Sequence, residues 1–334
     1  MSVVTRHDDS SYEVASRYGY IDPELVPALE ALPTNPFGTD GFGVAEVRAI
    51  NATIALPELP ADPGIGCRDI RRSADGPALR IIAPESDRPG RPCIFWIHGG
   101  GFVVGSPFDT DLRLFRWASE HDCVVVAVEY GLAPEHPYPQ GLEDCYAGLV
   151  WTWHHADELG INPAAIAVAG ESAGGGLAAA LALVARDRRE VEPCFQLLIY
   201  PMLDDRTVDA VDQPDTPVWT KAANAAGWVA YLGGDQRDGT SVAVTAAPGR
   251  AAPAQLKSLP ACLISVGSED LFRAENVAYA AALQAAAVPT DLHVYAGAFH
   301  GSDHLVPEAA VSRRFERDLD VALGRAFAQV QRGR

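Results

Sequence analysis

The stretch AIAVAGESAGGGLAAA, residues 165–180, decides the fold. Its apolar first part predicts a buried strand, and its alanine-rich last part predicts a helix. Between them, Gly170-Glu171-Ser172-Ala173-Gly174 has the pattern Gly-x-Ser-x-Gly. On a sharp strand-to-helix turn this pattern lifts a serine hydroxyl into a cleft. The pattern alone is weak, since ordinary loops also collect glycine and serine.

Other short apolar runs recur along the chain, and helix-compatible stretches lie between most of them. The predicted strands are 79–82, 93–97, 123–129, 166–169, 195–200, 261–266 and 290–295. The predicted helices are 109–121, 140–159, 174–188, 274–287 and 306–329. This alternation indicates an α/β fold, with a mostly parallel central sheet flanked by helices on both faces.

Two regions interrupt the alternation. Residues 1–45 precede the sheet, and residues 204–245 contain no predicted strand. We expect both to be helical and to form a cap together. The remaining chain, 46–334, is then one catalytic domain, with 204–245 inserted into it to complete the cap.

Capping signals suggest where helices lie in these regions. Ser10 to Glu13 has the spacing of a capping box, and Asp22-Pro23 and Thr216-Pro217 each place proline where a helix begins. Gly233-Gly234 is suited to a helix end.

Composition narrows the classes of partner. The formal net charge of −18 is spread along the 334 residues and would repel phosphate backbones, so nucleic acid is not expected. The six cysteines lack metal or redox spacing, and buried reduced thiols are favoured over disulfides. Neither an N-terminal signal core nor a stretch of membrane-spanning length is visible. A cytoplasmic protein without a membrane partner is the expectation.

A glycine run supports the serine turn. His98-Gly99-Gly100-Gly101-Phe102 follows the predicted strand 93–97 directly. Its backbone can approach a ligand closely, and its N–H groups can converge on a developing oxyanion. We expect the oxyanion donors to be the amides of Gly100, Gly101 and Ala173.

A reactive serine also needs a base and an acid that orients it, in the chain order serine, acid, histidine. His300 lies in the loop after strand 290–295 and is the preferred base. His304 is the fallback, whereas His293 lies inside the strand. Asp270, after strand 261–266, is preferred as the acid over its neighbour Glu269.

These residues and several further motifs resemble the bacterial hormone-sensitive-lipase family of α/β-hydrolases. The resemblance covers about residues 90–305. It adds YGLAPEHPYP at 130–139, LED at 142–144, YPMLD at 200–204 and DLFRAE at 270–275. It implies a capped α/β-hydrolase that cleaves short- to medium-chain esters with Ser172, Asp270 and His300. It also favours a homodimer, and the mechanism needs neither a metal nor an organic cofactor.

The resemblance also suggests a substrate pocket. Trp228 and Tyr231 match a cap helix that places aromatic rings over the acyl group, and Phe102 and Trp219 are further candidates. Simple packing of the cap is the competing interpretation of Trp228 and Tyr231, which lie three residues apart.

Three positions depart from the family pattern. Gly131 replaces a usual arginine, Glu171 stands where aspartate or threonine is more frequent, and Ser302 replaces a bulky apolar residue. None of them belongs to the expected triad, so we expect effects on loop rigidity and substrate preference.

Other functions remain open from the sequence. An amide or formamide hydrolase, or a lipase, would use the same triad. A non-catalytic ligand receptor is expected to lack a triad member, and this chain has all three.

Overall fold

The computed structural model describes residues 19–32, 43–51, 64–71, 76–209, 216–234 and 242–332. The predicted capping box at Ser10 to Glu13 lies outside these residues, as do parts of both cap regions.

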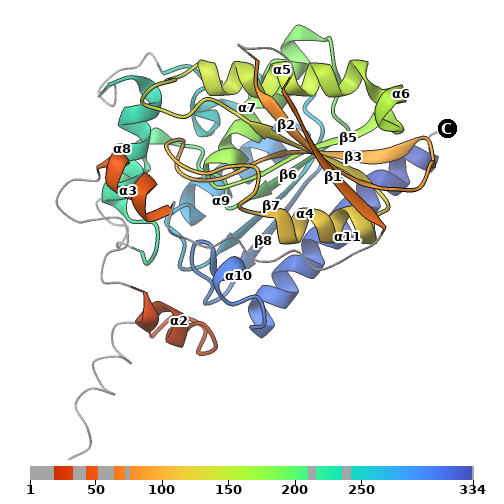
Figure 1. Ribbon diagram of the computed structural model, residues 1–334. Coiled ribbons are helices and arrows are strands. Elements are labelled where there is room, and N and C mark those ends of the chain that lie inside the picture. Colours follow the sequence, from red (N-terminus) through yellow and green to blue (C-terminus); the bar gives the residue numbers. More distant parts are fainter. Residues whose placement is uncertain are drawn as a thin grey trace, which may run out of the picture.

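One eight-stranded sheet forms the centre of the molecule (Figure 1), in the order β1-β2-β4-β3-β5-β6-β7-β8. The strands are β1 (Ile65–Arg71), β2 (Ala78–Pro84), β3 (Arg91–Ile97), β4 (Val124–Glu129), β5 (Ile161–Glu171), β6 (Phe195–Ile199), β7 (Ala261–Gly267) and β8 (Thr290–Tyr295). β1 and β2 pair antiparallel, and every pairing from β4 to β8 is parallel. The predicted mostly parallel sheet is confirmed.

Helices cover both faces of this sheet. The α-helices are α2 (Val26–Ala31), α3 (Val44–Asn51), α4 (Asp111–Glu120), α5 (Gln140–His154), α6 (Ala156–Leu159), α7 (Ala173–Arg188), α8 (Lys221–Leu232), α9 (Arg273–Ala285), α10 (Ser302–Leu305) and α11 (Ala310–Arg332). Short 3-10 helices are η1 (Asp205–Asp209), η2 (Pro248–Arg250) and η3 (Pro253–Gln255). Figure 1 shows α5 and α6 on one side of the sheet and α4 and α11 on the other.

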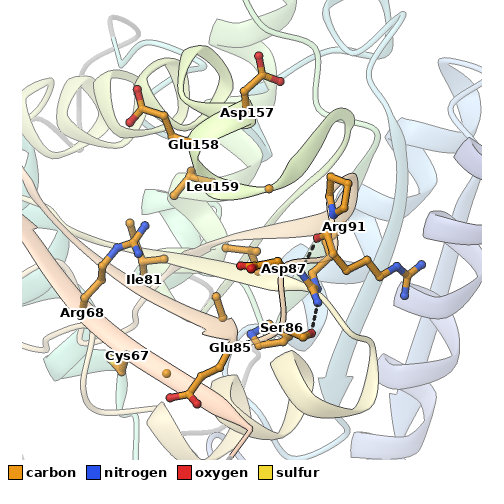
Figure 2. A pocket seen from close by; sticks show the side chains of 17 residues that line it. Cys67, Arg68, Ile81, Glu85, Ser86, Asp87, Arg91, Asp157, Glu158 and Leu159 are labelled. Carbon is orange, nitrogen blue, oxygen red and sulfur yellow. Dashed lines mark hydrogen bonds between the residues drawn. The ribbon is translucent and has the colours of Figure 1, made fainter.

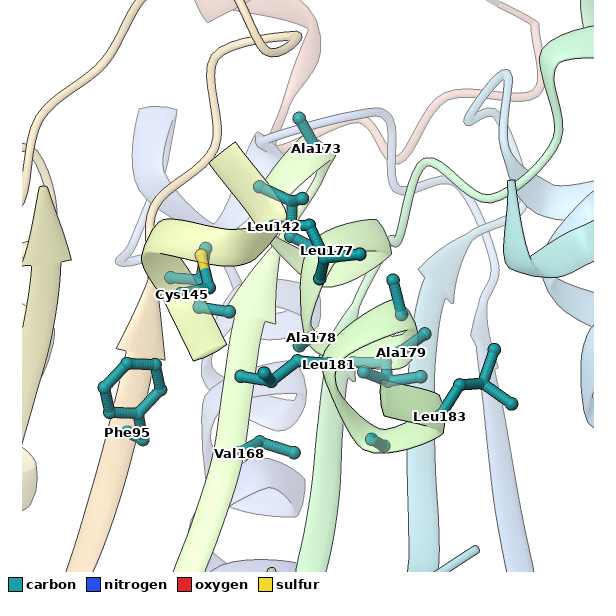
Figure 3. Packing of buried hydrophobic residues seen from close by; sticks show 14 of the residues in the cluster. Phe95, Leu142, Cys145, Val168, Ala173, Leu177, Ala178, Ala179, Leu181 and Leu183 are labelled. Atoms are coloured by element: carbon teal, nitrogen blue, oxygen red, sulfur yellow. The ribbon is translucent and has the colours of Figure 1, made fainter. Parts of the chain in front are cut away.

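Alternating side chains divide the core into two layers, because successive residues of a strand point to opposite faces. On β3, Phe95 belongs to the layer under α5, α7 and α9, whereas Trp96 belongs to the layer under α4 and α11. Figure 3 shows the first layer, with Leu142 of α5 near Leu177 of α7 and with Phe95 and Val168 on the strands.

Strand β1 was not predicted from the sequence. Three of its seven residues, IGCRDIR, are charged, and all seven are exposed or half-buried. As an edge strand it pairs only with β2 and needs no continuous apolar pattern.

Two predicted helix starts are wrong. α2 begins at Val26, because Asp22 accepts the Glu24 amide at 3.0 Å within a turn. α8 begins at Lys221, where Thr220 caps the helix by accepting the Ala223 amide, and not at Thr216-Pro217. Its predicted end is confirmed, since Gly233 adopts a left-handed conformation there.

Two further findings concern the chain as a whole. None of its six cysteines forms a disulfide, and four of them are buried. In the part of the chain that the structure describes, no helix is both long and apolar enough to span a membrane.

Truncating Phe95 tests how much this layer of the core contributes to the stability of the fold. Phe95→Ala removes a fully buried ring from a central strand and should lower the free energy of unfolding by about 3–5 kcal/mol. Val321→Ala on α11 is the matched control, because Val321 is exposed and its loss should change little. Urea unfolding followed by circular dichroism measures both, and equal losses would contradict the assigned layer.

Candidate active site

Ser172 lies at the turn between β5 and α7, with φ 53° and ψ −122°. A positive φ is uncommon for serine and costs free energy. The Ser172 amide donates to the Ile199 carbonyl at 2.9 Å, and its carbonyl accepts the Met202 amide at 2.9 Å. A Cβ at Gly174 would collide with the Ile97 carbonyl, so this turn requires glycine there. The turn is thus held by backbone contacts from two neighbouring strands.

His300 and Asp270 meet Ser172 in a continuous hydrogen-bonded line. His300 Nε2 lies 3.0 Å from Ser172 Oγ, and His300 Nδ1 lies 2.8 Å from Asp270 Oδ2. Asp270 Oδ1 also accepts the Phe272 amide at 2.9 Å, which fixes the carboxylate. All three residues are nearly buried, with exposed fractions of 6% for Ser172, 7% for His300 and 2% for Asp270.

The competing candidates lie elsewhere. Glu269 accepts the hydroxyl of its neighbour Ser268 at 2.8 Å. His293 faces Tyr295 and Asp318 from within β8. His304 contacts Glu171 and not Ser172.

Aromatic rings enclose the His300 imidazole on three sides. Tyr200 and Phe272 meet it edge-on at centroid distances of 4.7 and 5.2 Å, and Trp219 lies 6.3 Å away. Tyr200 and Phe272 are not predicted as site residues from the sequence. Both belong to quoted motifs, YPMLD and DLFRAE, and those motifs were the available signal.

The predicted glycine loop lies against Ser172. A Cβ at Gly99 would lie 3.3 Å from Ser172 Cβ. The Gly100 carbonyl accepts the amides of Val103 and Val104, both at 3.0 Å, which closes the loop into a tight turn. Gly100 has φ +105°, and a side chain there would collide with Val104.

Two buried contacts hold this loop from behind. The Tyr130 ring stacks on His98 at 4.3 Å, and its hydroxyl donates to the His98 carbonyl at 3.1 Å. The loop is therefore fixed before any ligand arrives.

The four predicted pocket aromatics are all buried beside this loop. Phe102 stacks on Tyr231 at 4.0 Å and lies 5.2 Å from Trp228. The indole of Trp219 covers Gly101, where an added Cβ would collide with it. Phe102, Trp228 and Tyr231 thus pack against one another, and Trp219 lies between the glycine loop and the His300 ring.

Gly131 and Ser302, which differ from the family pattern, both make contacts in the structure. The Gly131 amide donates to Asp144 at 2.9 Å, and a Cβ there would lie 2.9 Å from His136 Cβ. Arg48 of α3 brings a guanidinium to the same segment, bonding Glu135 at 2.7 Å through two nitrogens. Ser302 is buried, and its carbonyl accepts the Ser312 hydroxyl at 3.4 Å.

A separate cavity of about 500 Å³, whose lining Figure 2 shows, lies where β3, β4 and β5 begin, whereas Ser172 follows the end of β5. Its buried Arg91 is already paired, with Ser86 Oγ at 2.6 Å and Asp122 at 2.7 Å. This cavity contains no group of the serine site.

The architecture and the position of the serine turn are those of an α/β-hydrolase. The family model for the alpha/beta hydrolase fold matches residues 94–304. The chain belongs to the hormone-sensitive-lipase-like carboxylesterases of that superfamily.

Named relatives support this membership. Esterase LipI of Mycobacterium tuberculosis is 36% identical over 84% of this chain and 87% of its own length. Carboxylesterase NlhH of the same species is 35% identical over 87% and 92%. Among solved structures, a bacterial heroin esterase superposes with a TM-score of 0.86 at 37% identity, covering 93% of this chain and 99% of that one.

A buried carboxyl group on α9 supports the loop beside the site. Glu275 Oε1 accepts the Leu203 amide at 2.6 Å, and Oε2 accepts the Thr207 hydroxyl. Burial raises the pKa of Glu275 well above its usual value, and these hydrogen bonds offset that effect only in part.

The raised pKa predicts a pH dependence of stability. The unfolded state ionises near pH 4.5 while the folded state keeps its proton, so this residue's contribution to stability falls as pH rises above that value. E275Q keeps the shape without the charge. Relative to the wild type, E275Q should become more stable as the pH rises from 5 to 8. Urea unfolding at both pH values tests this, with exposed Glu192→Gln as the control; an identical change in both variants would contradict it.

Proposed function

We propose that this enzyme hydrolyses carboxylic esters with short to medium acyl chains, with Ser172 as nucleophile, His300 as base and Asp270 as orienting acid. The unbroken line of hydrogen bonds from Ser172 through His300 to Asp270 carries the proposal. The names of its relatives, an esterase and a carboxylesterase, support the ester class.

In the first step, His300 Nε2 takes the proton from Ser172 as the hydroxyl oxygen attacks the ester carbonyl. Asp270 accepts from the opposite ring nitrogen, which fixes the tautomer and stabilises the imidazolium. His300 then donates its proton to the departing alcohol and leaves an acyl group on the serine.

The developing oxyanion needs donors that are already in place. Gly100 and Gly101 lie in the tight loop beside Ser172, and Ala173 is the first residue of α7. The first amides of a helix have no partner within it, and the helix dipole adds positive potential there. We assign these three amides as the oxyanion donors. In the second step, His300 activates water, which releases the acid and restores Ser172.

We also propose that α8, together with the N-terminal helices α2 and α3, forms the cap over this site. A Cβ on Gly227 of α8 would lie 2.9 Å from the Gly101 carbonyl, so this helix lies directly on the glycine loop. Arg48 of α3 donates to the carbonyls of Val103 and Ala133 at 2.8 and 3.0 Å. Helix α3 spans residues 44–51 and therefore crosses the predicted boundary at residue 45.

Removing the nucleophile tests the mechanism. Ser172→Ala should fold normally and lose hydrolysis of p-nitrophenyl acetate by roughly a million-fold. Steady-state kinetics with matched circular dichroism spectra measures the effect. Substantial turnover by the folded variant would refute the assignment of Ser172.

A substrate panel tests the acyl pocket and the ester class. We expect p-nitrophenyl acetate and butyrate to be cleaved faster than the palmitate, because Phe102, Trp228 and Tyr231 are packed against one another beside the site. Phe102→Ala should shift the optimum toward longer chains, whereas Trp153→Ala, on α5, should not. Faster cleavage of the matched anilide would favour an amide hydrolase, and a palmitate optimum would favour a lipase. Light scattering of the same preparation tests the expected homodimer.

A further inference from the structure

A group of buried charges lies behind the nucleophile, and the proposed mechanism does not use it. Its centre is Arg113 of α4, whose side chain is only 5% exposed. Arg113 donates to Glu171 Oε2 at 3.0 Å, and its other terminal nitrogen contacts Asp303 and Glu316. Four segments of the chain thus meet at one guanidinium.

Glu171 receives a second bond on the same oxygen. His304 Nε2 lies 2.8 Å from Glu171 Oε2. Glu171 immediately precedes Ser172, and His304 follows His300 by four residues in the adjoining helix α10. The Glu171–His304 pair therefore joins the segment that carries the nucleophile to the segment that carries the base.

Tyr200 brings the same group into contact with the base. Its ring meets the His300 imidazole edge-on at 4.7 Å, and its hydroxyl donates to Asp303 Oδ2 at 3.4 Å. Asp303 also bonds Arg113, so the charged group reaches His300 through a packed ring as well as along the chain.

The pKa shifts of both groups favour an ion pair. Burial opposes ionisation of Glu171, but the facing charges of His304, Arg113 and His300 outweigh it and hold its pKa at about 2. Burial likewise opposes protonation of His304, yet Glu171 and Asp303 raise the pKa of that imidazole. Arg113 Nη1 lies 3.2 Å from His304 Nε2 and opposes protonation of that ring, but the carboxylates outweigh its effect.

We propose that Glu171 and His304 are positioning residues: their ion pair, anchored by Arg113, holds the nucleophile turn against the histidine loop and sets the pH range in which His300 acts as base. The proposal rests on the proposed ester hydrolysis through Ser172 and His300. Neither residue bonds to Ser172 Oγ or to the His300 ring, so both act through their neighbours.

The physical basis is twofold. The positive φ at Ser172 is held only while its surroundings restrain it, and a buried salt bridge on the preceding residue is such a restraint. Charges near the base also shift its titration, since a nearby anion favours the imidazolium and a nearby cation disfavours it. Glu171 and His304 should therefore act on His300 in opposite directions.

Charge-removing variants separate this role from a structural one. The acid limb of the kcat/KM profile reports protonation of the base in the free enzyme. E171Q removes an anion and should move that limb to lower pH, whereas H304Q removes a cation and should move it to higher pH, each by about half a unit. Both should lower kcat roughly tenfold with little change in KM, because positioning is lost while substrate contacts remain. E171D keeps the charge and should leave the limb where it is in the wild type.

Matched controls come from a second histidine–glutamate pair. His154 and Glu190 lie 3.6 Å apart with side chains 58% and 48% exposed, so H154Q and E190Q remove the same charges at the surface. We expect both to retain the wild-type profile. Limbs that move in the same direction in E171Q and H304Q, or that do not move, would overturn the proposal.

Thermal melts accompany each profile. If E171Q fails to fold, H304Q decides the matter, because the His304 side chain is 35% exposed and its loss leaves Glu171 paired with Arg113. Labelling by a fluorophosphonate reports Ser172 independently of turnover. An unlabelled wild type would refute the proposed function itself, whereas normal labelling with unshifted limbs would refute only the positioning pair.

Discussion

The positive φ angle of Ser172 is the constraint on which the rest of the site depends. At φ 53° the serine leaves β5 and enters α7 without an intervening residue, so its side chain stands out from the end of the sheet. Such a conformation persists only where several contacts over-determine it. Here the Ile199 carbonyl and the Met202 amide bond the backbone of Ser172, and the close approach of the Ile97 carbonyl excludes a side chain at Gly174. The stability of the central strands is thereby used to hold one reactive oxygen in place.

Parallel strand order then brings distant residues to that oxygen. β7 and β8 run parallel to β5 and β6, so the loops that follow them open at the same edge of the sheet. Asp270 follows β7 and His300 follows β8, which is why His300 lies within hydrogen-bond distance of Asp270, 30 residues away in sequence, and of Ser172, 128 residues away. The glycine loop after β3 arrives at the same edge from the other side. The loops that follow β3, β5, β7 and β8 are therefore enough to bring all these residues together.

The sequence predicted most of this because buried parallel strands and tight turns leave strong local signals. Seven of the strands appear as apolar runs, and the glycines mark the positions where backbone must approach backbone. β1 left no such signal, since an edge strand with residues such as Arg68 and Asp69 is not required to be apolar. The start of α8 was misplaced because Thr220 and Thr216 offer the same capping chemistry, and only tertiary packing chooses between them. The contacts of Tyr200 and Phe272 with His300 were not predicted, because the three rings come from separate loops and no sequence pattern relates their positions.

The group of charged side chains around Arg113 was likewise not predicted from the sequence. The free energy that its burial costs helps to explain its role. Removing an arginine and several carboxylates from water is unfavourable, and apolar residues of similar volume often replace such groups without loss of stability. Stability alone therefore does not account for Arg113 among Glu171, Asp303 and Glu316. What an apolar replacement would lack is direction: two donors on Glu171 Oε2 fix the position of the carboxylate, and with it the residue beside the nucleophile. An ion pair also keeps charged groups close to His300, which a hydrophobic cluster cannot do. The departure at Glu171 is therefore better understood together with His304 than as an isolated substitution.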